Sequence, residues 1–136
     1  FYMSEAISQD KRVYYNMLTE SRNGDYNEWI RFFLKKCVVQ ARNHIGYIDS
    51  LNELYEKTKE TLQTVINSPK YDLIAECLFT QPILTSAYLA ERLNVSSGQA
   101  RRYLDSLESA QILLGNDWKR NRRYYFIDLL ELARRT

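Results

Sequence analysis

A long run of apolar residues at helical spacing occupies the middle of the chain and limits the folds that it can adopt. Apolar side chains recur every three or four residues from Ile30 to Leu62, and no proline occurs before Pro69. We predict one continuous helix from Glu28 to Ile66, which would be roughly 58 Å long at 1.5 Å per residue. Such a helix is longer than a small domain is wide, so one of its ends must extend beyond its own core.

The segment that precedes this helix is also predicted to be helical. Apolar residues lie near helical spacing between Ser4 and Thr19. Turn-forming residues follow, and either Asp25 or Asn27 can cap the long helix. Asp25 with Glu28 has the spacing of a capping box, so we expect the long helix to start there.

The pattern changes after Pro69, where shorter elements follow one another. The order helix, helix, tight turn, helix and two-stranded hairpin is that of a winged helix-turn-helix domain. A last helix is expected after the hairpin. The expected elements are a helix over 71–79, an apolar pair at Ile83–Leu84, a helix from a Thr85 cap to Leu93, a helix from Ser96 to Ser109 capped by Ser96 or Ser97, strands over 112–114 and 124–127, and a helix over 128–135.

These elements predict a mainly α protein with two domains. Residues 1–69 form a helical segment with one long helix, and residues 70–136 form a winged helix-turn-helix domain with a small β-hairpin. Ala100, Leu104 and Leu107 are expected on the core face of the third helix of that domain, because they are four and three residues apart.

Positive charge is concentrated around this third helix and the hairpin. Residues 97–123 hold six Lys and Arg against three Asp and Glu, although the whole chain has a net charge of only +2. The third helix of the domain is the second helix of the helix-turn-helix motif, whose exposed first residues meet base edges in DNA complexes. A basic hairpin tip suits contacts to phosphate or to the minor groove. The predicted DNA-binding residues are Ser97, Gln99, Arg101, Arg102, Lys119, Arg120, Arg122 and Arg123.

Another interpretation stays open, in which these basic residues form an ordinary solvated face. The domain would then bind a protein rather than double-stranded DNA. Trp118 is either a wedge that contacts the partner or a ring folded back on the hairpin. Gln111 stands where glycine usually follows the third helix, which leaves the geometry of that turn open.

No pattern in the sequence predicts an active site, a cofactor or a metal. Cys37 and Cys77 are far apart in the chain and are expected to be buried structural thiols in a reducing cytoplasm. His44 lies inside the long helix and is expected to be hydrogen-bonded or solvated. No apolar run approaches 18 residues, so we expect no membrane span and a cytoplasmic protein.

The first half of the chain resembles the Fic (filamentation induced by cAMP) family. The similarity includes the residues Phe1-Tyr2-Met3-Ser4-Glu5, the run Arg12-Val13-Tyr14-Tyr15-Asn16-Met17-Leu18, and the more specific run from Gly24-Asp25 through Trp29-Ile30-Arg31-Phe32-Phe33-Leu34. These look like the segment that follows the catalytic motif of bacterial Fic proteins, many of which continue with a long helix and a winged helix. The run from Pro82-Ile83-Leu84-Thr85 to Leu107, and then Ile112-Leu113, resembles that later part.

The resemblance implies a parent protein that transfers AMP from ATP to hydroxyl side chains of target proteins. That activity depends on a motif of the form H-P-F-x-x-G-N-G-R, whereas the sole histidine here, His44, is followed by Ile45. No catalytic residue is therefore carried over, and the chain itself is not expected to be an enzyme. Because the chain begins with Phe1, we expect it to be a C-terminal piece that acts with the Fic catalytic core of its parent.

The first helices hold more aromatic and aliphatic side chains than one helix pair can bury. Phe32 and Phe33 point about 100° apart around the long helix, so both cannot face the preceding helix. We therefore expect an exposed apolar patch, and a homodimer that covers it. The residues concerned are Tyr14, Tyr15, Leu18, Trp29, Phe32, Phe33 and Leu34.

Overall fold

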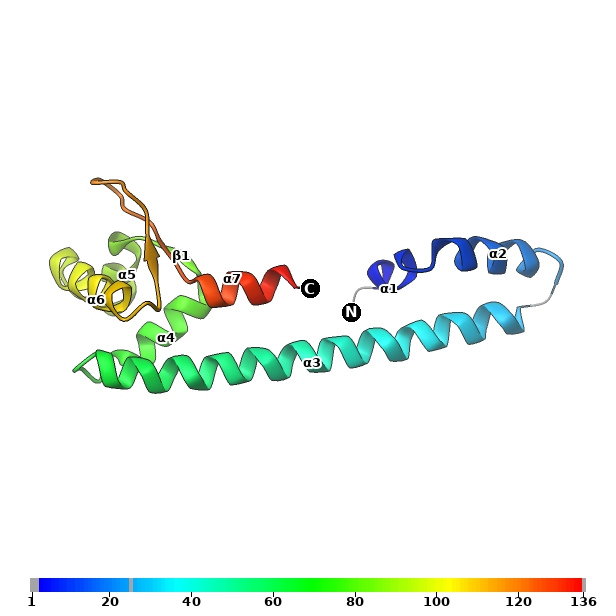
Figure 1. Cartoon of the computed structure of the whole chain (residues 1–136), viewed down its shortest axis with the longest axis horizontal. Coiled ribbons are helices and arrows are strands. Elements are labelled where there is room, and N and C mark those ends of the chain that lie inside the picture. Colours follow the sequence, from blue (N-terminus) through cyan, green and yellow to red (C-terminus); the bar gives the residue numbers. More distant parts are fainter. Residues whose placement is uncertain (1–2, 25, 136) are drawn as a thin grey trace. The chain divides into compact units, whose positions relative to one another are not determined.

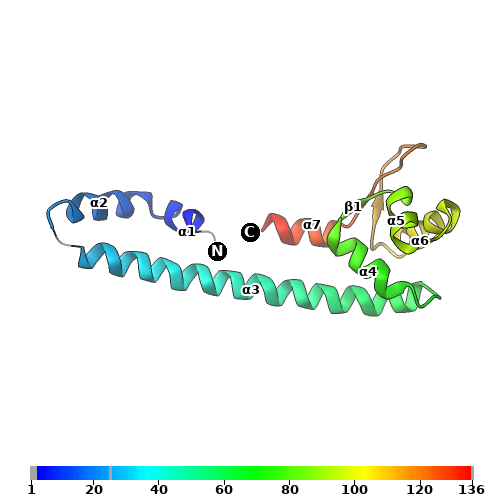
Figure 2. The ribbon, with the colours of Figure 1, turned by 180° about the vertical axis from the view of Figure 1, so that it is seen from behind.

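The computed structural model describes residues 3–24 and 26–135. The protein is mainly helical and has a small three-stranded antiparallel sheet (Figures 1 and 2). The chain divides into two compact units, residues 1–49 and residues 50–136, and helix α3 contributes to both. Along the chain the elements are α1 (Ser4–Ser8), α2 (Lys11–Ser21), α3 (Asn27–Val65), α4 (Tyr71–Thr80), β1 (Ile83–Leu84), α5 (Ser86–Leu93), α6 (Ser97–Ser109), β2 (Leu114–Gly115), β3 (Tyr124–Tyr125) and α7 (Ile127–Arg134).

The prediction of one long helix in the middle of the chain is confirmed. Helix α3 continues for 39 residues, and the amide of Ile30 donates to the carbonyl of Tyr26 in its first turn at 2.9 Å. Asn27 is already the first residue of this helix rather than its cap. The other expected cap, Asp25, lies outside the described residues.

The N-terminal unit contains α1, α2 and the first half of α3. The prediction of one helix over 4–19 is wrong, because the backbone leaves helical geometry at Asp10, with φ −129° and ψ 47°. The carboxylate of Asp10 instead forms an ion pair with Lys36 of α3. The break thus places a charged side chain where it meets its partner on the neighbouring helix.

Aromatic rings contribute to the N-terminal unit both between helices and within α3. The rings of Tyr14 in α2 and Phe32 in α3 lie 6.4 Å apart, and within α3 the ring of Trp29 stacks on that of Phe33 at 5.4 Å. Phe32 and Phe33 are each half-buried in this way. Of the seven residues expected in an exposed apolar patch, Tyr15 and Leu34 are exposed and the other five are half-buried.

The C-terminal unit has one hydrophobic core to which every one of its elements except β2 contributes a buried side chain. Leu62 from the last turns of α3 and Ile66 just after that helix are buried in it. Edge-to-face contacts at 5.1 and 5.3 Å connect Tyr55, Phe79 and Phe126. The compact unit consequently begins at Ser50, well before the residue 70 boundary that the sequence pattern suggested.

The turn between α5 and α6 has hydrogen bonds that fix both of its ends. Thr85 Oγ1 accepts from the amide of Tyr88 at the start of α5, and Ser96 Oγ accepts from the amide of Gln99 at the start of α6. Asn94 adopts the left-handed conformation, with φ 54°, and ends α5. The predicted caps Thr85 and Ser96 are thereby confirmed, and α6 leaves the turn in a defined direction.

The sheet has the order β1-β3-β2, and both pairs are antiparallel. Leu114 pairs with Tyr125 and Gly115 with Tyr124, so the predicted hairpin exists but its strands are shorter than expected. Strand β1 was predicted only as an apolar pair. It joins the sheet through Tyr125 and Tyr124, and the amide of Phe126 donates to the carbonyl of Pro82 at 2.8 Å.

Gln111 occupies a strained position immediately after α6. Its φ is +62°, in the left-handed region that glycine adopts at low cost, and its side chain is exposed. We predict that Gln111→Gly raises the free energy of unfolding by about 0.5–1 kcal/mol, because relief of this strain outweighs the extra freedom of glycine in the unfolded chain. Urea denaturation measures the change, and a lower midpoint for the variant would contradict it.

Within the described ranges, none of the helices combines the length and the apolar character that crossing a membrane requires.

Candidate nucleic-acid interface

Helix α6 has one buried face and one charged face. Ala100, Leu104 and Leu107 are completely buried, which confirms the predicted core positions. Arg101 and Arg102 are exposed on the other side. The helical spacing that buries the three apolar residues therefore places both arginines in solvent.

The hairpin loop, residues 116–123, is held by the side chain of Asn116. Its Oδ1 accepts from the backbone amides of Trp118 and Arg123 at 3.2 and 3.1 Å, and the backbone amide of Asn116 donates to the carbonyl of Arg123. One amide side chain thus ties both sides of the loop together. The basic residues Lys119, Arg120 and Arg123 of this loop are all exposed.

Arg122 differs from the other predicted cations because it is bonded inside the chain. Its Nη2 donates to Glu108 Oε1 of α6 at 2.9 Å, and its Nε donates to the carbonyl of Asn116 at 2.8 Å. The guanidinium also lies over the ring of Tyr124, 5.2 Å from its centroid. Partial desolvation opposes ionisation of this group, but the bond to Glu108 outweighs it and the pKa of Arg122 is raised.

Tyr124 completes this connection between the hairpin and α6. Its hydroxyl donates to Asp105 Oδ1 at 2.8 Å, and Arg122 Nη1 lies 4.0 Å from the same oxygen. Burial raises the pKa of Tyr124, and the hydrogen bond to Asp105 raises it further, so the phenol remains a donor. Together Arg122, Tyr124, Asp105 and Glu108 form what we term the hairpin clasp.

Glycine is required beside the hairpin clasp. A Cβ atom at Gly115 would lie 2.5 Å from Nη2 of Arg122 and 2.6 Å from Oε2 of Glu108. Any side chain at this position would displace the ion pair. Gly115 thus allows Arg122 and Glu108 to meet against the backbone of β2.

An open groove runs between α6 and the hairpin loop. Its volume is about 490 Å³, and it is lined by Arg101, Asn116, Asp117, Trp118, Lys119 and Arg122. The groove therefore brings one cation from α6 together with two cations from the hairpin. The Trp118 ring is 53% exposed, and the guanidinium of Arg123 lies 5.1 Å from its centroid.

A comparison with protein-family models and with curated proteins finds no match for this chain. The functional interpretation accordingly depends on the groove and on its surrounding charges.

The remaining predicted site residues lie outside this groove. Ser97 and Arg120 are exposed, and Arg102 lies on the same helix as Arg101 without lining the groove. Gln99 is half-buried. Hydrogen bonds from Ser68 and then from Gln99 lower the pKa of Tyr103.

Sequence reasoning missed three residues that shape this surface. Asn116 organises the loop, Tyr124 connects the hairpin to α6, and Asp117 adds a carboxylate to the groove. Asn116 next to Gly115 gave a turn signal, but nothing in the sequence indicated which side chain would bridge the loop. Asp105, which accepts from the Tyr124 hydroxyl, is 19 residues away in the chain, so no local pattern connects the two.

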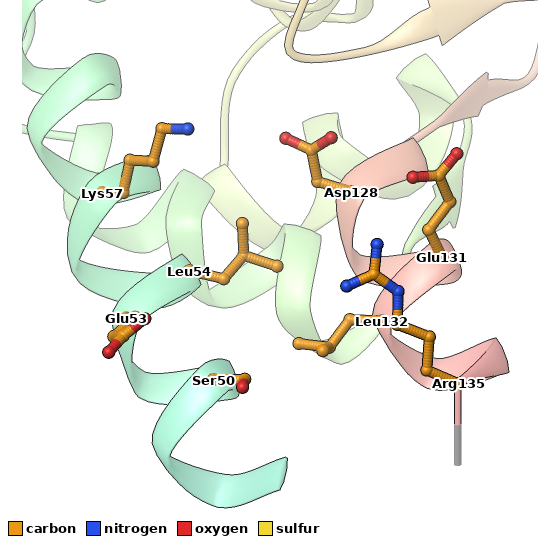
Figure 3. A pocket seen from close by; sticks show the side chains of 8 residues that line it. All are labelled: Ser50, Glu53, Leu54, Lys57, Asp128, Glu131, Leu132 and Arg135. Atoms are coloured by element: carbon orange, nitrogen blue, oxygen red, sulfur yellow. The ribbon is translucent and has the colours of Figure 1, made fainter. Parts of the chain in front are cut away.

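A second depression lies between residues 50–57 of α3 and helix α7, with a volume of about 390 Å³ (Figure 3). Leu54 and Leu132 point into the space between the two helices. Charged side chains of both signs surround them. Because Glu53, Asp128 and Glu131 outnumber Lys57 and Arg135, this depression is a poor candidate for binding a polyanion.

The sulfur and imidazole groups do not assemble into a metal site among residues 3–24 and 26–135. Cys77 is buried as predicted, and burial raises the pKa of its thiol. Cys37 is only half-buried, contrary to the expectation of two buried thiols. The ring of His44 is hydrogen-bonded to Gln40, with 2.9 Å between Nε2 of each residue, in line with the expected bonded histidine.

Proposed function

We propose that the C-terminal unit is a winged helix-turn-helix module that binds double-stranded DNA. The observation that carries the proposal is the groove between α6 and the hairpin loop, which both Arg101 and Lys119 line. The order α4, β1, α5, α6 and a β2–β3 hairpin supports the winged helix interpretation. In this arrangement α6 would be the recognition helix and the hairpin would be the wing.

The exposed cations would divide their roles according to position. Arg101, on the first turns of α6, has the chemistry to read guanine in the major groove. Lys119, Arg120 and Arg123 on the hairpin loop suit phosphate contacts, which give affinity without sequence preference. The hairpin clasp would fix the distance between these two groups of cations, since it bonds the hairpin directly to α6.

The alternative function is a protein-interaction module without DNA binding. Asp117 in the groove and the neutralisation of Arg122 by Glu108 favour it, because both reduce the positive field at the surface. In either case we propose that the module serves a larger Fic-type protein that transfers AMP. The run from Gly24 to Leu34, which resembles the segment after the catalytic motif of Fic proteins, supports that parentage. In this proposal the chain supplies no catalytic group to AMP transfer.

The proposal predicts that binding depends on the positions of the cations rather than on total charge. Replacing Arg101, Lys119 and Arg120 together by Ala should weaken binding to a labelled duplex by more than about tenfold at low salt, because three close contacts to DNA are lost. Fluorescence anisotropy measures the dissociation constant.

A matched control removes the same charge from elsewhere. Lys11, Arg12 and Arg22 are exposed in or beside α2, and their replacement by Ala should leave affinity within about twofold. Equal weakening by the two triple variants would show non-specific attraction only. Absence of duplex binding by the wild-type chain at low salt would favour the protein-interaction alternative.

A further inference from the structure

Helix α3 has a second apolar face in the N-terminal unit, away from α2. Five aliphatic side chains lie on this face, of which four are 50–59% exposed and the fifth is a half-buried alanine. The α2 contacts use Phe32 and Lys36. At 100° per residue, these lie about 150° around the helix from the aliphatic row. The row, here called the α3 seam, consists of Leu34, Val38, Ala41, Ile45 and Ile48.

The spacing of the α3 seam is that of a coiled coil. Successive members are four, three, four and three residues apart, which is a heptad repeat of a and d positions. Val38 and Ile45 occupy a positions, and Leu34, Ala41 and Ile48 occupy d positions. A row that only packed against the body of a single domain would not need this strict alternation.

The exposed area is large enough for a dimer contact. Leu34, Val38, Ile45, Ile48 and the adjacent Ile30 are each about half exposed, on the order of 100 Å² apiece, so the patch approaches ~500 Å². Pairing of two such faces removes roughly 1,000 Å² from water, which reaches the size of a specific interface. At about 25 cal/mol per Å², this burial favours association.

We propose that the α3 seam pairs with the same seam of a second copy of this chain, as a parallel two-stranded coiled coil. β-branched residues at a positions with leucine at d favour two parallel strands, and Val38, Ile45 and Leu34 fit that preference. In-register pairing places every seam residue against its own counterpart, so all five layers are apolar.

The flanking charges are compatible with the parallel direction. The e positions hold Lys35, Arg42 and Asp49, whereas the g positions Ile30, Cys37 and His44 carry no acidic residue, lysine or arginine. Parallel pairing sets e against g, so no fixed like charges meet. Antiparallel pairing with the same seam residues in contact sets e against e, which brings two copies of Arg42 together but also sets Lys35 against Asp49 of the other copy. The preference for the parallel direction therefore rests on the a and d residues.

Sedimentation of the full chain tests which face pairs. The wild-type chain should sediment at micromolar concentration with twice its 16.2 kDa mass. Val38→Glu combined with Ile45→Glu should halve that mass, because two a layers become charged, while circular dichroism keeps its helical signal. The control Val39→Glu changes an exposed valine outside the seam and should remain dimeric. A monomeric wild-type chain, or a dimeric double variant, overturns the proposal.

Cross-linking tests the direction and does not depend on a destabilising change. In a Cys37→Ser background, Ile48→Cys places one thiol at a d position, and mild oxidation should give a disulfide-linked dimer. Val39→Cys in the same background should give none, and Cys77 is buried in both. A dimer in which Ile48→Cys does not cross-link would overturn parallel pairing. Neither experiment involves DNA, so the proposal stands or fails independently of the proposed function.

Discussion

Replacement of Leu107 by alanine should lower the free energy of unfolding by about 2–5 kcal/mol. The Leu107 side chain is completely buried on α6, so its removal leaves a cavity as well as losing apolar burial. The backbone bonds at this site remain, since the Leu107 carbonyl accepts from the amides of Ile112 and Leu113 in either variant. The expected loss is therefore a packing effect, measurable by urea denaturation.

The matched control is the same substitution at an exposed leucine. Leu114 in β2 is 59% exposed, and Leu114→Ala should change the free energy of unfolding by less than about 0.5 kcal/mol. An unchanged denaturation midpoint for Leu107→Ala would mean that α6 presents a different face to the core. Arg101 and Arg102 would then not be directed to solvent, and the candidate interface would lose its basis.

Local patterns predicted the helices well because their signals lie within a few residues of each other. Thr85 and Ser96 are N-caps in the structure, and both signals involve an acceptor and an amide three residues later. The core face of α6 follows in the same way from the spacing of Ala100, Leu104 and Leu107. The helical period also predicted α3 correctly, since nothing in 39 residues interrupts it.

Interactions between distant residues explain most of what the sequence did not predict. The break at Asp10 accompanies an ion pair with Lys36, which is 26 residues away. Strand β1 exists because β3 pairs with it across 40 residues of chain. Two-residue strands carry too little alternation for a sequence pattern to detect.

The candidate site was predicted in composition but not in geometry. The sequence located the basic residues, and the structure shows that Arg101 and Lys119 line one groove. In the sequence Arg122 could not be distinguished from Arg120 and Arg123, which are arginines of the same loop. In the structure it is bonded to Glu108 and packs on Tyr124. Only the fold determines which arginine meets a carboxylate, because that carboxylate lies on another element.

If the proposed interface binds DNA, its affinity should fall steeply as salt rises. Four exposed cations are available for phosphate contacts: Arg102, Lys119, Arg120 and Arg123. With about 0.9 counterions released per contact, the slope of log affinity against log salt should be about −3.6. Between ~50 mM and ~200 mM salt, affinity should therefore drop by roughly a hundredfold.

The most direct measurement is this slope for the wild-type chain and for a variant with Lys119, Arg120 and Arg123 replaced by Ala, titrated against the same duplex. The account predicts a slope of about −3.6 for the wild type and about −1 for the variant, because the hairpin loop loses three phosphate contacts. Equal slopes for the two proteins, or no duplex binding by the wild type at the lowest salt, would contradict DNA binding through this surface.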